Sequence, residues 1–139
     1  MPDTFQLEIV TPEKKVVETA AEEVQIPGKN GYLGVLPGHA PLITELSVGE
    51  ITYRENSGSG GNEQRLAVAW GFAEVLPDKV TILAETAERA AEIDITRAQA
   101  AKQRAEANLA GSATEEDFQR VTADLQRAET RLEVAEKKS

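Results

Sequence analysis

Cysteine is absent from this chain of 139 residues, and histidine occurs only once. The sequence therefore excludes a disulfide framework, a zinc–thiolate site, a cysteine nucleophile and a metal site built from several histidines. The glycine-rich phosphate-binding patterns G-x-x-x-x-G-K-[ST] and G-x-G-x-x-G are also missing. Acidic pairs such as Glu22 and Glu23 are adjacent, and neighbours in a strand point to opposite faces, so they do not form a catalytic dyad. We therefore expect no enzymatic activity.

Large apolar features are scarce as well. Aromatic residues make up 4% of the chain, and no apolar run approaches the ~18 residues that a transmembrane helix needs. The N-terminus has no basic region followed by an apolar stretch, so we expect no signal peptide. The formal net charge of −9 argues against general binding of nucleic acid. Together with the lack of cysteine, these features favour a cytosolic protein.

Proline and glycine are confined almost entirely to the first part of the chain. All six prolines lie at or before Pro77, and nine of the ten glycines lie at or before Gly71. Beyond about Glu92, alanine, glutamate and arginine dominate. This change of composition predicts two parts, residues 1–86 and residues 87–139.

The first part carries short alternating runs that predict β-strands. One run begins at Phe5 and another at Val80, each with apolar residues at every second position. In a third run, Leu66, Val68 and Trp70 are expected to share one face of a strand. Several such runs at short spacing predict an antiparallel β-sandwich.

The second part predicts two helices folded into an antiparallel hairpin, so the expected fold class is α+β. Apolar residues recur from Phe118 onward at alternating steps of three and four, which is the spacing of an a/d stripe. Gly111 is a candidate C-cap of the first helix, and Thr114 is a candidate N-cap of the second. The stripe comprises Phe118, Val121, Leu125, Ala128, Leu132 and Ala135, and the facing helix offers Ala98, Ala101, Ala105 and Leu109.

The segment Gly31–Leu42 holds three glycines and two prolines in twelve residues. Local physics allows either a structural turn at the sandwich edge or a loop that is presented to a partner. The segment matches G-x-L-G-[IV]-x-P-G-H-x-P-L, while Gly71–Val75 and Val80–Ala84 match G-[FI]-x-E-V and V-T-[VI]-L-A. On these motifs and the hairpin, essentially the whole chain resembles the epsilon subunit of bacterial and chloroplast F-type ATP synthase. One departure is Trp70, where many members of that family carry glycine.

The resemblance implies a non-catalytic subunit of the central stalk, the rotor of a proton-translocating ATP synthase. A ten-stranded sandwich would contact the gamma subunit near His39 and approach the c-ring near Tyr32. The hairpin would permit ATP hydrolysis when it is folded onto the sandwich. It would inhibit hydrolysis when it is extended to the alpha/beta catalytic head. The subunit would lie at the cytoplasmic face of the bacterial plasma membrane, held there only through the complex.

A regulatory ATP site is also implied by the resemblance, with no other cofactor and no metal. The family's [IL]-D-x-x-R-A motif is matched by residues 93–98. Asp94 could accept a hydrogen bond from the adenine or the ribose, and Arg97 could reach phosphate or stack on the base. Ile93 and Ala98 would leave a small apolar seat for the base. The expected nucleotide-binding residues are Glu88, Ile93, Asp94, Arg97, Ala98, Arg127 and Arg131.

Other interpretations of the same residues stay open. Asp94 could be only an N-cap with Arg97 as its ion-pair partner, and the arginines could form a solvated face with pairs such as Asp124–Arg127. From another class of protein, the chain could be a soluble regulatory factor that inserts its coiled-coil hairpin into another large enzyme. Residues Glu115–Asp117 near the hairpin tip would then hold a metal. A small β-sandwich enzyme would need a cluster of titratable residues, which the sequence does not contain.

Overall fold

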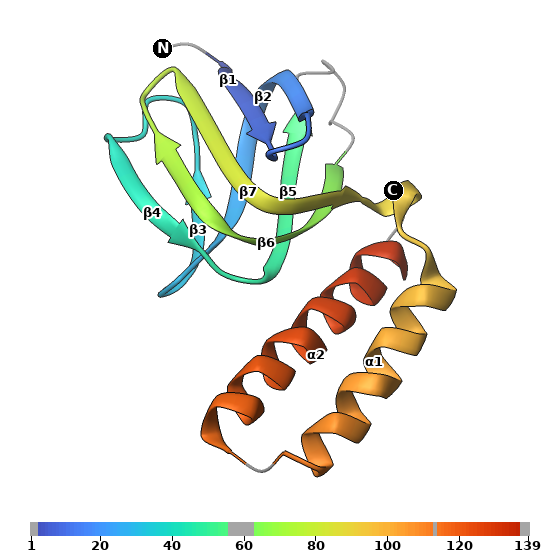
Figure 1. Ribbon diagram of the computed structural model, residues 1–139. Coiled ribbons are helices and arrows are strands. Elements are labelled where there is room, and N and C mark those ends of the chain that lie inside the picture. The colour runs from blue at the N-terminus through green and yellow to red at the C-terminus, as the bar shows by residue number, and fades with distance from the viewer. Residues whose placement is uncertain (1–2, 56–62, 113, 137–139) are drawn as a thin grey trace.

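The computed structural model describes residues 3–55, 63–112 and 114–136 of the chain. A domain built from strands is followed by two helices that form a hairpin (Figure 1), which confirms the predicted α+β fold. The strands are β1 (Phe5–Val10), β2 (Lys15–Gly28), β3 (Gly31–Val35), β4 (Leu42–Leu46), β5 (Gly49–Glu55), β6 (Glu63–Val75) and β7 (Lys79–Arg89). A short 3-10 helix, η1 (Ala90–Glu92), leads into α1 (Ile95–Ala110) and α2 (Glu115–Glu136).

The long strands pair with different neighbours along their length. The strand order is β1-β7-β6-β4-β2-β3, while β5 pairs with β2 and β6, and β1 also pairs with β2. The first half of β2 pairs with β1, and its second half pairs with β3 and β5. The described residues therefore form seven strands, whereas the resemblance implied ten. Among the described pairings β1 and β7 run parallel, so the sandwich is mixed rather than antiparallel throughout.

Alternation along the strands fills the core of the sandwich. In β1, Phe5, Leu7 and Ile9 are buried, whereas the intervening residues are only partly buried. Successive strand residues point to opposite faces, so a period of two in the sequence becomes one apolar face. All buried members of this core lie between Phe5 and Ala84. The sandwich therefore has a core of its own, to which the helices contribute no buried residue.

Strand β6 changes its phase at Trp70 and Gly71. Leu66 and Val68 face the core before this point, and Ala73 faces the same core after it. Ala73 lies an odd number of residues after Val68, so in a regular strand it would point to the opposite face. Trp70 has a φ of 51°, and among the described residues it is the one non-glycine residue with positive φ. Such a conformation costs about 1–3 kcal/mol. The expectation that Trp70 shares a face with Leu66 and Val68 is wrong, because the kink carries its side chain out of the core.

Both helix caps of the hairpin lie where the sequence predicts them. The Oγ1 atom of Thr114 accepts a hydrogen bond from the Asp117 amide at 3.0 Å, as an N-cap does. Gly111 is the C-cap of α1, and its amide donates to the carbonyls of Asn108 and Leu109. Its φ of −100° shows that this cap does not use the left-handed conformation that glycine usually supplies there.

The predicted stripe on α2 is confirmed over most of its length. Val121, Ala128 and Ala135 are buried, and Leu132 is half-buried. Phe118, in contrast, is 52% exposed, because it lies in the first turn of α2, where α1 has already ended. Among the described residues, no helix is long and apolar enough to cross a membrane.

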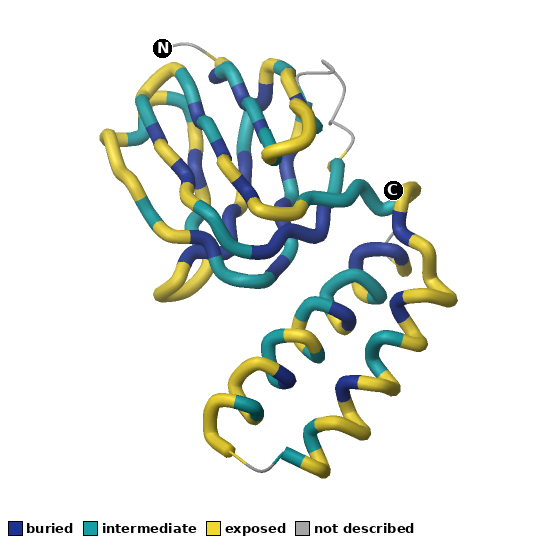
Figure 2. Tube along the Cα trace, in the orientation of Figure 1, coloured by how far each residue is buried: buried dark blue, intermediate teal, exposed yellow. Residues whose placement is uncertain are grey.

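The hairpin packs against the sandwich through a second, smaller core (Figure 2). Ala67 of β6 meets Ile93, Ala98, Val134 and Ala135, all of them buried. The contact involves the start of α1 and the end of α2, so the far end of the hairpin projects away from the sandwich (Figure 1). The hairpin is therefore docked on the sandwich at one end.

Strand β7 runs to Arg89, beyond residue 86, where the sequence placed the end of the sandwich. Its last residues are paired with β6, as the partners Ala67 and Glu88 illustrate. Helix α1 begins only at Ile95, after the 3-10 turn. The connection between the two parts is thus residues 90–94.

Candidate functional site

A cavity of about 260 Å³ lies between α1 and α2. Its charged lining consists of Arg104, Arg127, Arg131 and Asp124. A guanidinium group binds phosphate or carboxylate through two parallel hydrogen bonds, so three arginines against one aspartate suit an anion. The remaining lining residues are small or polar: Ala101, Ala105, Asn108 and Ala128.

Arg127 and Arg131, which the sequence predicted to share a site, both line this cavity. Each also contacts the sandwich. The Nε of Arg131 lies 2.7 Å from Oε1 of Glu88, and its Nη2 donates to Oε2 at 3.1 Å. The Cζ of Arg127 lies 4.8 Å from the ring centroid of Trp70. Glu88 thus offsets part of the positive charge of the cavity and links the cavity to β7.

Asp94 and Arg97 lie outside the lining of the cavity. Asp94 is the N-cap of α1, and its Oδ1 accepts a hydrogen bond from the Arg97 amide at 3.0 Å. Within the described residues, no ion pair joins the side chains of Asp94 and Arg97, or those of Asp124 and Arg127. Arg97 is exposed and lies one helical turn before Ala101, on the face of α1 that lines the cavity. The two residues therefore flank the end of the cavity that lies nearer the sandwich.

Ile93 and Ala98 belong to the core between the hairpin and the sandwich. They are 7% and 0% exposed and pack with Ala67, Val134 and Ala135. Protein atoms thus cover the apolar seat that the sequence assigned to a nucleotide base. A base at this end would have to lie beside these side chains rather than directly on them.

Arg104 is the cavity arginine that the prediction of nucleotide-binding residues omitted. The sequence placed it seven residues after Arg97, hence on one stripe of the first helix. Its position beside Arg127 depends on the register between the two helices, which brings both to one cavity. That register could have been estimated from the alanines of the facing stripes, such as Ala105 and Ala128.

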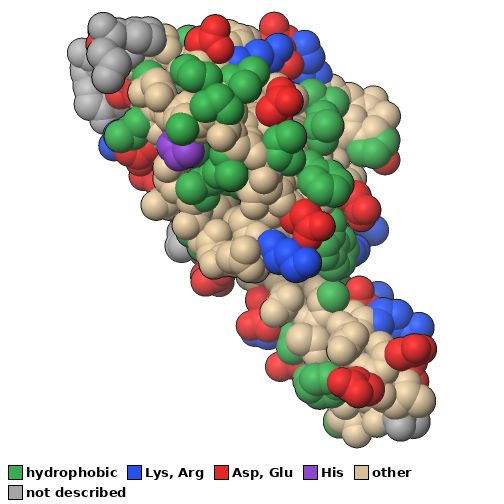
Figure 3. Space-filling model, turned by 90° about the vertical axis from the view of Figure 1, so that its left-hand side faces the viewer, with side chains coloured by type: hydrophobic (Ala, Val, Ile, Leu, Met, Phe, Trp, Pro, Cys, Tyr) green, Lys and Arg blue, Asp and Glu red, His purple; other side chains and the backbone are tan. Residues whose placement is uncertain are grey.

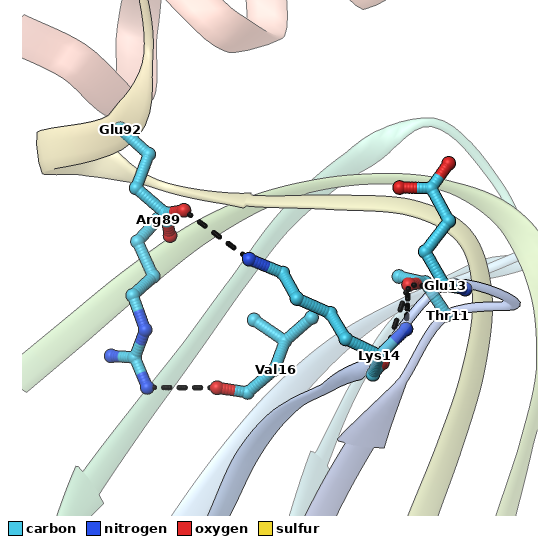
Figure 4. Close-up of polar contacts among 6 residues, drawn as sticks. All are labelled: Thr11, Glu13, Lys14, Val16, Arg89 and Glu92. Atoms are coloured by element: carbon cyan, nitrogen blue, oxygen red, sulfur yellow. Dashed lines mark hydrogen bonds and ion pairs between the residues drawn. The ribbon is translucent and has the colours of Figure 1, made fainter.

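The end of β7 and the connection after it contact the start of β2 and the turn between β1 and β2 (Figure 4). Arg89 Nη2 donates to the Val16 carbonyl at 3.0 Å, and Lys14 Nζ lies 3.7 Å from Glu92 Oε2. Burial raises the pKa of the Tyr53 hydroxyl, and the nearby Arg89 guanidinium opposes that rise. Arg89 and Glu92 thus both contact the sandwich near the point where the chain leaves it.

An apolar patch lies on the outer face of β4, β6 and β7. Its members Ile43, Phe72 and Leu83 are 68%, 53% and 54% exposed. Phe72 and Leu83 are cross-strand partners, and Val10 of β1 is the partner of Leu83 on its other side. A group of exposed apolar side chains of this kind is typical of an interaction surface. Sequence reasoning missed this outer apolar patch, although apolar residues at successive positions of β7 were a signal for it.

Tyr32 and His39 lie on the segment between β2 and β4. Tyr32 is 61% exposed on β3, and its hydroxyl accepts a hydrogen bond from the Glu50 amide at 3.1 Å. His39 lies in the loop after β3, and its Nδ1 donates to the Ala40 carbonyl at 2.7 Å. Figure 3 shows this single histidine among hydrophobic side chains. The segment is thus both an edge strand and a surface loop.

Residues Glu115–Asp117, the metal site of the alternative hypothesis, lie at the start of α2. Within the part of the chain that the structure describes, no group of acidic or histidine side chains could hold a metal ion. Asp117 instead accepts a hydrogen bond from Arg120 Nη2 at 3.2 Å. The geometry gives no support to the interpretation as a metal-carrying channel factor.

Comparison with known proteins identifies the family. A model described as the beta-sandwich domain of the ATP synthase Delta/Epsilon chain matches residues 4–90, and one described as its long alpha-helix domain matches residues 91–136. The ATP synthase epsilon chain of Koribacter versatilis (strain Ellin345) is 67% identical over 115 residues, covering 83% of this chain and 78% of that protein. The epsilon chain of Solibacter usitatus (strain Ellin6076) is 49% identical over 138 residues, covering 99% of this chain and 100% of that protein.

The fold has a solved counterpart. A chain from the cryo-EM structure of Euglena gracilis mitochondrial ATP synthase, OSCP/F1/c-ring, matches with a TM-score of 0.81 and 24% identity, covering 97% of this chain and 82% of that chain. At that identity the match supports the fold alone. The family models span both parts, and the curated relatives extend over nearly the whole sequence. The resemblance found in the motifs is therefore confirmed, and this chain belongs to the family of ATP synthase epsilon chains.

Proposed function

We propose that this chain is the rotor subunit of a proton-translocating F-type ATP synthase and restrains ATP hydrolysis through its helical hairpin. The docked hairpin is the observation that carries this proposal. The sandwich core contains no helix residue, and the helices are held to it by a small separate core and two arginine contacts. Such a contact can open while both parts stay folded. The subunit would act by position and perform no bond chemistry.

The outer apolar patch is the proposed contact with the gamma subunit. Ile43, Phe72 and Leu83 together offer apolar surface on a rigid sheet, and His39 lies in the loop that leads to the strand of Ile43. The edge that carries Tyr32 would face the c-ring. Through these contacts the chain would lie at the cytoplasmic face of the bacterial plasma membrane, attached only by the complex.

A pull-down with the gamma subunit tests this contact. Replacement of Phe72 by glutamate should leave the sandwich folded, because the side chain is 53% exposed, and should abolish capture of gamma. Phe118→Glu is the matched control, since Phe118 is 52% exposed on the hairpin tip and should not touch gamma in the folded state. Equal capture by both variants would exclude the outer apolar patch as the contact.

The hairpin would have two positions with opposite effects. In the docked position that the structure has, the small core buries Ile93, Ala98 and Val134 against the sandwich. In an extended position the helices would reach the alpha/beta catalytic head and inhibit hydrolysis. Release would expose this core and separate Arg131 from Glu88, so the docked position is favoured unless the catalytic head supplies replacement contacts.

ATP is the proposed ligand of the cavity between the helices. The volume of the cavity, about 260 Å³, lies just below the range of roughly 300–1,000 Å³ that is usual for small-molecule sites. The cavity therefore has room for the phosphates but not for the whole nucleotide. We place the triphosphate against Arg104, Arg127 and Arg131. The ribose and base would lie beyond the cavity, toward Asp94 and Arg97. Asp94 is exposed and uses one carboxylate oxygen as a cap, so the other can accept from the nucleotide.

Nucleotide binding would shift the hairpin by mass action. The cavity is lined by both helices, so it would be lost in an extended position in which the two helices separate. A ligand that binds only the docked hairpin stabilises the docked position, and this stabilisation grows with the logarithm of the ratio of ligand concentration to Kd. Plentiful ATP would thus keep the hairpin docked and relieve inhibition of the catalytic head.

Isothermal titration of the full chain with ATP tests the cavity. Arg104→Gln is the sharpest variant, because Arg104 lines the cavity and, among the described residues, has no hydrogen bond or ion pair with the sandwich. Loss of one charge-assisted hydrogen bond should weaken binding roughly tenfold or more. Arg120→Gln is the control, since Arg120 pairs with Asp117 outside the cavity. Absence of heat with millimolar ATP, or equal affinity of both variants, would rule the site out.

A further inference from the structure

Trp70 lies where strand β6 changes its phase. Its φ of 51° is followed by a φ of 124° at Gly71, and the two residues shift the strand from one phase to the other. Glycine would adopt the backbone conformation of Trp70 without strain. The backbone conformation therefore does not explain why this position holds a tryptophan. A favourable contact made by the indole side chain would offset the backbone strain.

The partner of that side chain is Arg127 of α2. Its Cζ lies 4.8 Å from the centroid of the indole ring, within the range of a cation–π contact. Arg127 Nε is buried, and no hydrogen-bond partner for it lies among the described residues. A guanidinium that has lost water at one nitrogen interacts more strongly with an aromatic face, because the ring replaces part of the lost solvation. The contact joins residues from different parts of the protein, since Trp70 belongs to the sandwich.

We propose that Trp70 is a latch that holds the hairpin in the docked position by stacking on Arg127, without any bound nucleotide. The latch lies beside the small core, because Trp70 follows Ala67 on the same strand and Arg127 precedes Val134 on the same helix. It is a property of the isolated chain. Only its consequence, a bias against the extended position, rests on the proposed function.

Hydrogen exchange of the full chain without nucleotide tests the latch. Trp70→Gly should relax the strained backbone and slow exchange in β6 and β7, yet speed exchange at the end of α2. The two opposite changes distinguish a latch from a residue that merely supports the sandwich. A cation–π contact of ordinary strength predicts a roughly two- to thirtyfold faster opening of the hairpin.

Arg127→Met provides a second variant that leaves the backbone of β6 unchanged. It should speed exchange at the end of α2 to a similar extent and alter the fluorescence of Trp70, which is the one tryptophan of the chain. The double variant should open no faster than the faster single variant, because both remove the same contact. Arg120→Met, at a 73% exposed side chain on the same helix, should change nothing. Unchanged α2 exchange in either single variant, or effects that simply add, would overturn the latch.

Discussion

Arg131 of α2 and Glu88 of β7 form an ion pair in which Nη2 donates a hydrogen bond to Oε2 at 3.1 Å and Nε lies 2.7 Å from Oε1. The side chains are 20% and 35% exposed, so the pair is shielded from solvent more than a surface ion pair is. It joins residues that lie 43 positions apart, one in the sandwich and one in the hairpin. The hairpin cannot leave the sandwich without breaking it.

Glu88→Gln should therefore weaken docking without unfolding the sandwich. We expect a loss of about 1 kcal/mol in the docking free energy, because the pair has one charge-assisted hydrogen bond and a second close contact yet is partly screened by solvent. Hydrogen exchange at the end of α2 would measure it. Asp117→Asn is the control, since the Arg120–Asp117 pair lies within one helix and is largely exposed. An equal effect of the two substitutions would mean that Glu88 has no special part in docking.

Val134→Asp should release the hairpin. Val134 is fully buried in the small core, so an unpaired carboxylate there would cost about 3–5 kcal/mol if the hairpin stayed docked. We expect fast exchange in both helices and an unchanged melting temperature of the sandwich. Phe118→Asp, at the exposed tip of α2, should leave docking intact. A hairpin that stays protected in Val134→Asp would contradict the docking surface described for α2.

Gly71→Ala should destabilise the sandwich by more than about 3 kcal/mol. A Cβ at this position would lie 1.9 Å from the Leu83 carbonyl oxygen, and the φ of 124° is unfavourable for any side chain. Gly34→Ala provides the comparison, because no atom lies within 4 Å of a Cβ placed there. Thermal unfolding of the two variants should differ by many degrees, and similar melting temperatures would show that β6 can rearrange around the kink.

Local periodicity predicted the parts of the fold that repeat within one element. The alternation that starts at Phe5 predicted β1, and the three-and-four spacing predicted the stripe that buries Val121 and Ala128. The conformation of Trp70 could not be predicted in this way. Its positive φ reflects how β6, β7 and α2 meet, which depends on contacts between elements rather than on spacing along one of them.

In the candidate site, too, positions within one helix were predictable from sequence, whereas contacts between helices were not. Arg127 and Arg131 are one helical turn apart, so their shared side of α2 was predictable from sequence. Arg104 lies on the other helix, and its place in the cavity depends on the register between α1 and α2. The motif at Asp94 marked the start of α1 correctly, yet spacing could not reveal that the buried Ile93 would be covered by the end of α2.

Truncation after Ala90 should give a folded sandwich. All buried members of its core lie before that residue, at or before Ala84. Truncation after Glu85 should be less stable, because it removes the part of β7 from Thr86 to Arg89 that pairs with β6. Circular dichroism and thermal unfolding would compare the two. Equal stability would place the boundary near residue 86, and an unfolded chain of residues 1–90 would show that the sandwich needs its helices.

ATP hydrolysis by an epsilon-depleted F1 complex tests directly whether the hairpin regulates the enzyme. The full chain should lower the hydrolysis rate at low ATP concentration, and higher ATP concentrations should relieve this inhibition. A chain of residues 1–90 should bind the gamma subunit equally well and leave the rate unchanged. Equal inhibition by the full and the shortened chain, each shown to be bound, would contradict a regulatory role of the hairpin.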